Sequence, residues 1–234
     1  MLSDSPVAVE QHGPELLHHF VDAKQQRDAA TLGMWLFLAT EIMFFGGMFC
    51  AYLIYRFWYY NEFAVGSRSI DLKWGTINTA VLICSSLTVA LGVRAAQMGK
   101  RKLVVVLLLL TIVFGLTFLG IKSIEWYSKF EEHHVPGRSF NADDLVKAYP
   151  QIHIDPQREQ IFFSLYFAMT GLHALHMIIG VGVFAFLTYY AWKGRYTPEY
   201  YTPIEMGGLY WHFVDIVWIY LFPLLYLIDR KPLG

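Results

Sequence analysis

The chain has 234 residues, of which 56% are hydrophobic and 17% aromatic but only 16% charged. Soluble domains usually carry about 25% charged residues, so this composition excludes an ordinary soluble domain. The formal net charge of −1 offers no basic surface to nucleic acid, which is excluded as a partner. Because the apolar residues come in long blocks, the sequence predicts an all-α, polytopic integral membrane protein.

Five apolar segments are long enough to cross a bilayer, which takes about 20 residues. They are residues 33–55, 75–97, 103–124, 161–192 and 206–228. We therefore expect a five-helix transmembrane domain over residues 33–228, with an outer loop at 126–160 and a short C-terminal tail at 229–234. The N-terminal tail, residues 1–32, could contain a short interfacial helix.

Basic residues gather in the two short links that share a side with the N-terminus. These residues are Arg94, Lys100, Arg101 and Lys102 in the first link, and Lys193 and Arg195 in the second. Cytoplasmic loops of membrane proteins are enriched in lysine and arginine. The N-terminus is therefore predicted to lie in the cytoplasm. The C-terminus should lie outside, because an odd number of helices separates the two.

The most informative polar residues lie inside the apolar segments. They are Glu41, His173, His176, His212 and Asp215. On a helix, His212 and Asp215 share one stripe with Glu205 and Gly208. Ionisable groups inside a membrane cost roughly 2.5–3.5 kcal/mol each on insertion scales, so they should face protein and find partners. From its depth, Glu41 could meet His176 near mid-membrane, or His212 and Asp215 nearer the cytoplasm.

Two interpretations of these residues stay open, a buried hydrogen-bonded network that fixes helix register and a proton-handling site. A third would make the chain a free-standing membrane metalloenzyme using His173, His176 and His212, since histidines three apart can share a metal. However, His212 should lie about 9 Å from the cytoplasmic end of its helix and His176 about 15–24 Å from the same end of its own. We therefore expect no metal ligand in this chain.

Two further predictions concern less distinctive residues. Lys122 and Glu125 stand three apart near the end of the third segment, and with Trp126 beside them they are expected to form an interfacial pair. Cys50 and Cys84 lie within apolar segments and are expected to be small core residues.

Five motifs occur in a fixed order along the chain. They are Phe-Leu-Ala-Thr-Glu-Ile-Met-Phe-Phe at 37–45, Asn-Thr-Ala-Val-Leu at 78–82, Glu-Trp-Tyr at 125–127, Thr-Gly-Leu-His-Ala-Leu-His at 170–176 and Trp-His-Phe-Val-Asp-Ile-Val-Trp at 211–218. Together they resemble subunit III of the haem–copper respiratory oxidases, in the short five-helix form of bacteria.

The resemblance implies a non-catalytic integral subunit of a proton-pumping terminal oxidase of aerobic respiration, in the bacterial cytoplasmic membrane. In that family the haems and copper belong to partner subunits, so no cofactor is expected on this chain. The expected partners are the catalytic subunit I, subunit II, and phospholipids whose headgroups contact Arg56, Lys193 and Arg195. The resemblance further implies support of proton uptake and of the catalytic subunit's stability.

The electron donor is left open by the sequence. A cytochrome c oxidase is the first expectation, while a quinol oxidase and a subunit-III-like partner of nitric oxide reductase are the alternatives. Nothing in this chain is expected to touch the donor, so its residues do not discriminate between them.

Overall fold

The computed structural model describes residues 20–137, 140–152 and 154–228. The all-α prediction is confirmed over these residues, which contain helices and no strand. The helices are α1 (Ala23–Trp58), α2 (Tyr60–Ser69), α3 (Leu72–Gln97), α4 (Arg101–Glu131), α5 (Asp143–Ala148), α6 (Pro156–Lys193) and α7 (Thr202–Tyr226). Five of them, α1, α3, α4, α6 and α7, are long and apolar enough to span a membrane, as predicted.

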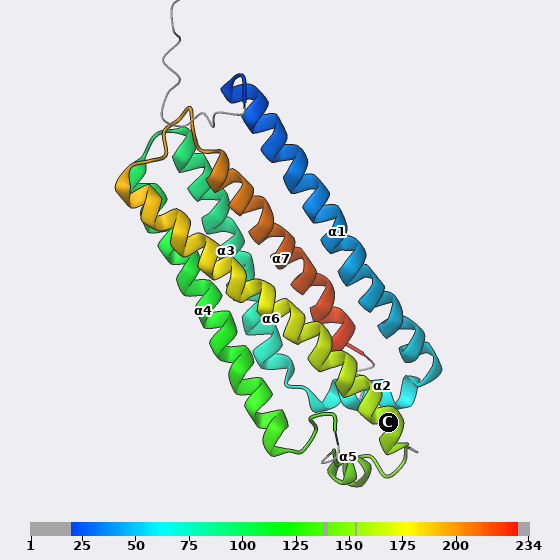
Figure 1. Cartoon of the computed structure of the whole chain (residues 1–234). Coiled ribbons are helices and arrows are strands. Elements are labelled where there is room, and N and C mark those ends of the chain that lie inside the picture. Colours follow the sequence, from blue (N-terminus) through cyan, green and yellow to red (C-terminus); the bar gives the residue numbers. More distant parts are fainter. Residues whose placement is uncertain (1–19, 138–139, 153, 229–234) are drawn as a thin grey trace, which may run out of the picture.

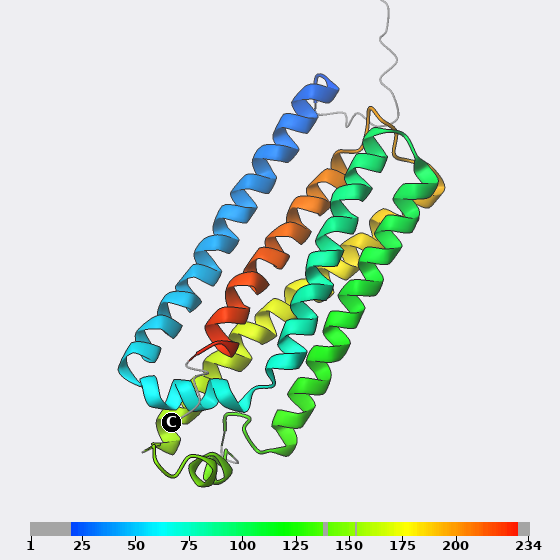
Figure 2. The same cartoon turned by 180° about the vertical axis from the view of Figure 1, so that it is seen from behind.

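The five long helices run alternately up and down (Figure 1). The short helices α2 and α5 lie at one end of the bundle, and the α3–α4 and α6–α7 connections lie at the other. α4 packs against α3 and α6, whereas α7 packs against α1, α3 and α6. Seen from behind in Figure 2, α7 lies between α1 and α3. α7 is accordingly the most enclosed of the five long helices, with 56% of its most apolar stretch buried.

The helices extend beyond the apolar segments that predicted them. The expected loop at 126–160 is too long, because α4 continues to Glu131 and α6 already begins at Pro156. α1 likewise begins inside the expected tail at Ala23, while residues 1–19 of that tail lie outside the described residues. The 36 residues of α1 span about 54 Å, well beyond the roughly 30 Å hydrocarbon core.

Side-chain caps set several of these boundaries. The carboxylates of Asp22 and Asp155 accept hydrogen bonds from backbone N–H groups in the first turns of α1 and α6. Pro156 occupies the first position of α6, where its missing N–H costs no helical bond. Gly194 ends α6 in the left-handed conformation at φ 78°. Capping residues outside the apolar segments therefore set where these helices begin and end.

α7 is the central helix of the bundle, and glycines on the neighbouring helices make room for its Trp211 side chain. The Trp211 ring lies between α4 and α6, and a side chain at Gly115 or Gly180 would come within about 3 Å of it. Its indole N–H donates to Ser85 Oγ at 3.0 Å on α3. Trp218 is equally buried, against Phe118 at a 4.7 Å ring-centroid separation.

α1 makes the thinnest contact with the rest of the bundle. Its buried residues, Leu38, Phe45 and Tyr52, follow one another at intervals of seven. Only 17% of its most apolar stretch is buried, compared with 56% for α7. The Tyr52 hydroxyl donates to the carbonyl of Leu224 at 2.6 Å and joins α1 to α7 near the C-terminal end of α1. Most of α1 therefore faces outward.

Two smaller regions complete the description. In the connection between α4 and α6, His134 stacks on Phe163 of α6 and its Nε2 lies 3.2 Å from Asp144 Oδ1 of α5, so the segment packs on the bundle. Cys50 and Cys84 are exposed, and the prediction that they are core residues is wrong. An apolar environment does not imply burial in protein, because hydrocarbon accepts a thiol as readily as a protein core does.

Candidate functional site

Glu41 and His176 form a direct pair between α1 and α6. Glu41 Oε2 lies 3.2 Å from His176 Nε2, and both side chains are mostly covered. His176 Nδ1 lies 2.9 Å from the carbonyl oxygen of Leu172, which can only accept, so Nδ1 carries a proton. The contact between Nε2 and the carboxyl group has the length of a hydrogen bond between the two helices. Of the two meetings expected for Glu41, this is the one that forms.

His173 lies one turn along α6 from this pair but has a different setting. Its ring is 1% exposed and packs between Phe118 and Trp218, at centroid separations of 5.4 and 5.2 Å. Neither ring nitrogen has a hydrogen-bond partner among the described residues. His173 is therefore surrounded by aromatic rings and does not join the hydrogen bonds of Glu41 and His176.

His212 and Asp215 lie on the middle of α7, where it faces away from α4 and α6. His212 Nδ1 lies 2.8 Å from the hydroxyl oxygen of Ser86 on α3. The Asp215 carboxyl lies beside Ser86, yet neither of its oxygens has a hydrogen-bond partner within the described chain. Both side chains line a hollow of about 440 Å³ between α3 and α7. This is a polar site open on one side.

The five predicted residues thus occupy three settings, and the structure does not join them into one continuous network. Over the described residues, no three histidine, cysteine or carboxylate side chains lie close enough together to hold a metal ion. His173, His176 and His212 each take different neighbours. The three histidines of the metalloenzyme alternative therefore do not converge on one centre.

The most extensive polar network is one whose partners the sequence did not predict. Lys122 and Glu125 are enclosed by protein, since their side chains are only 2% and 4% exposed, while their interfacial depth in the membrane stays a prediction. The Lys122 ammonium donates to Glu125 Oε1 at 2.8 Å, to the Tyr226 hydroxyl at 2.7 Å and to the Tyr166 hydroxyl at 3.0 Å. Both phenols donate in turn to Glu125 Oε1. The network ties α4, α6 and α7 together.

A sequence signal for this network did exist. The buried residues of α4 recur every three or four positions, through Gly115, Phe118, Lys122, Glu125 and Lys129. Lys122 and Glu125 lie on that inward stripe, and this position indicates that they are buried in the bundle. Their nearness to the end of the apolar segment says nothing about which face of α4 they occupy. The partners on α6 and α7 were not available from spacing within α4.

A second buried polar group lies where α2 crosses α6. Glu62 and Glu159 are 5% and 0% exposed, and Arg158 approaches Glu62 at 3.9 Å. Gly66 permits this contact, because a Cβ there would lie 2.3 Å from the Phe162 ring. No periodicity in the sequence predicted α2 or this crossing, since both depend on the return of α6 to the same end of the bundle.

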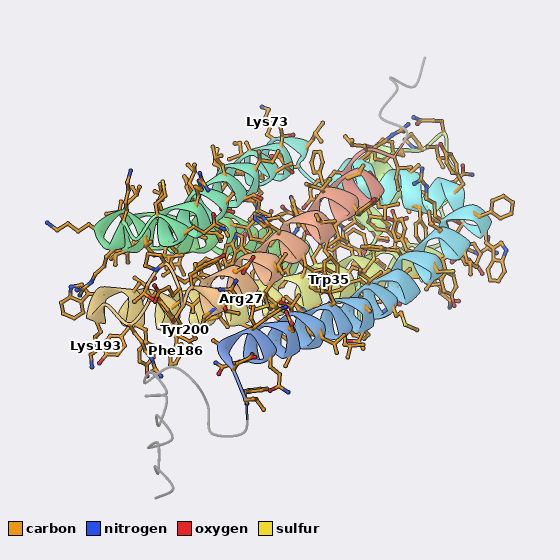
Figure 3. All side chains as sticks on the ribbon, turned by 90° about the horizontal axis from the view of Figure 1, so that it is seen from above. Arg27, Trp35, Lys73, Phe186, Lys193 and Tyr200 are labelled. Atoms are coloured by element: carbon orange, nitrogen blue, oxygen red, sulfur yellow. The ribbon has the colours of Figure 1, made fainter. Side chains whose placement is uncertain are left out.

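The residues expected to contact lipid headgroups lie at the two ends of the bundle. Arg56 is half-buried near the end of α1, whereas Lys193 and Arg195 are exposed and lie over the rings of Tyr189 and Tyr190. In Figure 3, Lys193 lies at the end of α6 and points away from the helices. Such positions suit cations at a membrane boundary.

Together these features define a class: a small polytopic helical membrane protein whose intramembrane polar side chains mainly join its helices. The family model described as cytochrome c oxidase subunit III matches residues 17–133 and 156–229. The chain belongs to this family and is a subunit III of a haem–copper oxidase. The unmatched interval contains α5 and most of the connection between α4 and α6.

Curated relatives agree with this assignment. Cytochrome c oxidase subunit 3 of Thermostichus vulcanus is 30% identical over 213 residues, covering 89% of this chain and 92% of the relative. The subunit 3 of Corynebacterium diphtheriae is 30% identical over 214 residues, covering 89% and 93%. A third relative, cytochrome bo(3) ubiquinol oxidase subunit 3 of Pseudomonas putida, is 30% identical over 200 residues, covering 84% of each chain.

Proposed function

We propose that this chain is a non-catalytic subunit III, most simply of a cytochrome c oxidase, and that it assembles with subunits I and II. The observation that carries the proposal is the family match, which includes all five membrane-spanning helices. The haems and copper of the complex then belong to the partner subunits. The chain's own contribution is made by its intramembrane polar groups and its outer surface.

The Glu41–His176 pair is our proposed point of contact with proton uptake. A carboxyl group and an imidazole that share one proton can take up or release a proton with little movement. Glu41 lies on α1, the long helix least enclosed by the bundle, so a neighbouring subunit can approach the pair from that side. In this role the chain assists proton entry and protects the catalytic subunit during turnover, without touching oxygen or the electron donor.

We further propose the orientation and the lipid contacts. The basic residues of the α3–α4 and α6–α7 connections favour a cytoplasmic position for that end of the bundle, with the N-terminus. The bacterial relatives favour a bacterial cytoplasmic membrane. Phospholipid headgroups would then meet Lys193 and Arg195 on the inner side and Arg56 on the outer side.

A quinol oxidase is the second candidate, and one observation favours it. The Pseudomonas putida relative is named as a ubiquinol oxidase subunit and is as similar as the cytochrome c oxidase subunits. A partner of nitric oxide reductase has no comparable support among these relatives. The donor is decided by subunit II, through the presence or absence of its copper ligands.

Co-purification tests the assembly. The tagged chain is extracted in mild detergent, and the associated proteins are identified by mass spectrometry and an optical spectrum. We expect a haem-bearing catalytic subunit in equal amount, with the sequence of the accompanying subunit II distinguishing the two donor classes. A chain that purifies alone, carrying its own iron or haem, would contradict the proposal.

Substitution of Glu41 tests the proton role in the intact complex. Glu41→Gln keeps the side-chain shape but cannot share a proton as a carboxyl group does, so proton uptake per electron should fall and inactivation during turnover should accelerate. Glu199→Gln, in the exposed α6–α7 connection, is the matched control and should change neither. Unaltered proton uptake in an assembled Glu41→Gln complex would contradict the proton role and leave the pair with a structural role alone.

A further inference from the structure

α7 lies between α1 and α3 and packs against both helices (Figure 2). One hollow of about 470 Å³ lies between α1 and α7, and another of about 440 Å³ lies between α3 and α7. His212 and Ile216 line both hollows, so these are two halves of one surface. Ile216 is 51% exposed and forms a ridge between them. We call this surface the α7 trough.

Polar groups occur at the centre of this otherwise apolar surface. Asp215 lies about 20 Å along the 25-residue helix α7, so it stands near mid-membrane. His212 Nδ1 lies 2.8 Å from the Ser86 hydroxyl oxygen, and the ring lines both hollows. Asp215 is 4% exposed and lies just under the floor, with both oxygens unpartnered among the described residues. Ser86 has one O–H and can serve at most one of those oxygens.

Hydrocarbon does not satisfy these groups. Lipid acyl chains neither donate nor accept hydrogen bonds, and polar side chains at this depth face protein or water in stable membrane proteins. The Lys122 and Glu125 side chains follow this rule, since they bond each other and two phenols. Other polar groups without a partner among the described residues, those of Asn78 and His173, are enclosed by the chain's own side chains. The unpartnered groups of the α7 trough instead line an open surface, which has room for side chains on both sides of the Ile216 ridge.

We propose that the α7 trough seats a transmembrane helix of another subunit of the oxidase, which brings an amide or hydroxyl side chain to the level of His212 and Asp215. An amide or hydroxyl both donates and accepts, so it matches either tautomer of His212 as well as a carboxyl oxygen. It also adds no charge to the membrane interior. The inference rests on the proposed function, because its partner is another subunit of the same complex.

Photocrosslinking in the assembled oxidase identifies the occupant. p-Benzoylphenylalanine is placed at Ile219, which lines the hollow between α3 and α7 and is 48% exposed, and at Ile178 on α6 as the control, 57% exposed. The Ile219 probe should join the chain to one transmembrane segment that contains an amide or hydroxyl residue at that depth. The Ile178 probe should not capture that segment. Crosslinks from Ile219 to lipid alone, or to a segment without such a residue, would overturn the proposal.

Two variants test the energetics through the amount of catalytic subunit that co-purifies. His212→Phe removes both ring nitrogens and should lower recovery about threefold to eighteenfold, the range of a single interhelical hydrogen bond in membranes. His212→Gln should restore part of that recovery. Ile216→Trp blocks the trough from an exposed position that the chain's own fold does not need, and should lower recovery at least as much. Ile178→Trp is its control and should remain within about twofold of wild type.

The two proposals fail in different ways. If the unsubstituted chain brings down no haem-bearing subunit, the proposed function is wrong. If it assembles normally but Ile216→Trp and His212→Phe assemble equally well, the proposed function stands and the trough is not the docking surface.

Discussion

Two polar regions of this bundle differ in where their hydrogen bonds go. Around Lys122, one ammonium, one carboxylate and two phenols from α4, α6 and α7 bond one another in the protein interior. Around Asp215, a carboxyl and an imidazole lie on the outward face of α7 with a single internal bond, to Ser86. The first region serves the chain's own fold, whereas the second suits contact with another protein.

The largest effect should come from breaking the Lys122 network. Lys122→Met leaves the Glu125 carboxylate buried without its cation, which should cost about 3–5 kcal/mol of unfolding free energy. The double variant Lys122→Met, Glu125→Gln should recover most of that loss, because neither charge is left alone. The measurement is unfolding of the full chain in mixed micelles. Lys102→Met, at an exposed position, is the control, and a double variant as unstable as the single would contradict the account.

Removing one phenol should have a smaller effect on the same network. Tyr166→Phe and Tyr226→Phe each delete a hydroxyl that donates to Glu125 and accepts from Lys122. A hydrogen bond to a charged group contributes about 1.5–3 kcal/mol, so each variant should lose about that much stability. Tyr60→Phe, on an exposed ring, should change the same measurement by less than about 0.5 kcal/mol. Losses no larger than this control would argue against a tightly bonded network.

The Glu41–His176 contact should show an intermediate coupling. A double-mutant cycle with Glu41→Leu and His176→Phe should give a coupling free energy of about 0.6–1.7 kcal/mol, as found for hydrogen bonds between membrane helices. The cycle that pairs Glu41→Leu with His212→Phe should give a value near zero, because His212 bonds Ser86 instead. Equal coupling in the two cycles would mean that the histidines belong to one network after all.

The smallest effect on the isolated chain should come from Asp215. Asp215→Leu removes a carboxyl group that has no hydrogen-bond partner within the described chain, so unfolding free energy should change by less than about 0.5 kcal/mol or increase. Glu125→Leu, by contrast, strands the Lys122 ammonium and should cost about 3–5 kcal/mol. A large loss of stability for Asp215→Leu in the isolated chain would remove the distinction between the two regions.

Much of the fold followed from the sequence, and the candidate site followed only in part. The five membrane-spanning helices were predicted because about 20 consecutive apolar residues have few alternatives to a helix in a bilayer. The Glu41–His176 meeting was one of two that helix rise allowed. The burial of Lys122 and Glu125 in a shared network was not predicted, since their partners Tyr166 and Tyr226 lie 41 to 104 residues away along the chain.

The sequence by itself determined the number of spans, the polar residues inside them and the family to which the chain belongs. All three depend on local composition or on ordered motifs. The membrane requires an apolar composition of each span, and common descent preserves the order of the motifs, so both are visible in the sequence. Only the tertiary structure decided which polar groups pair and which face outward. Hydrophobicity does not separate a helix face that meets protein from one that meets lipid, because both are apolar. Helix packing alone therefore buried Lys122, exposed Cys50 and left His212 and Asp215 on the floor of the α7 trough.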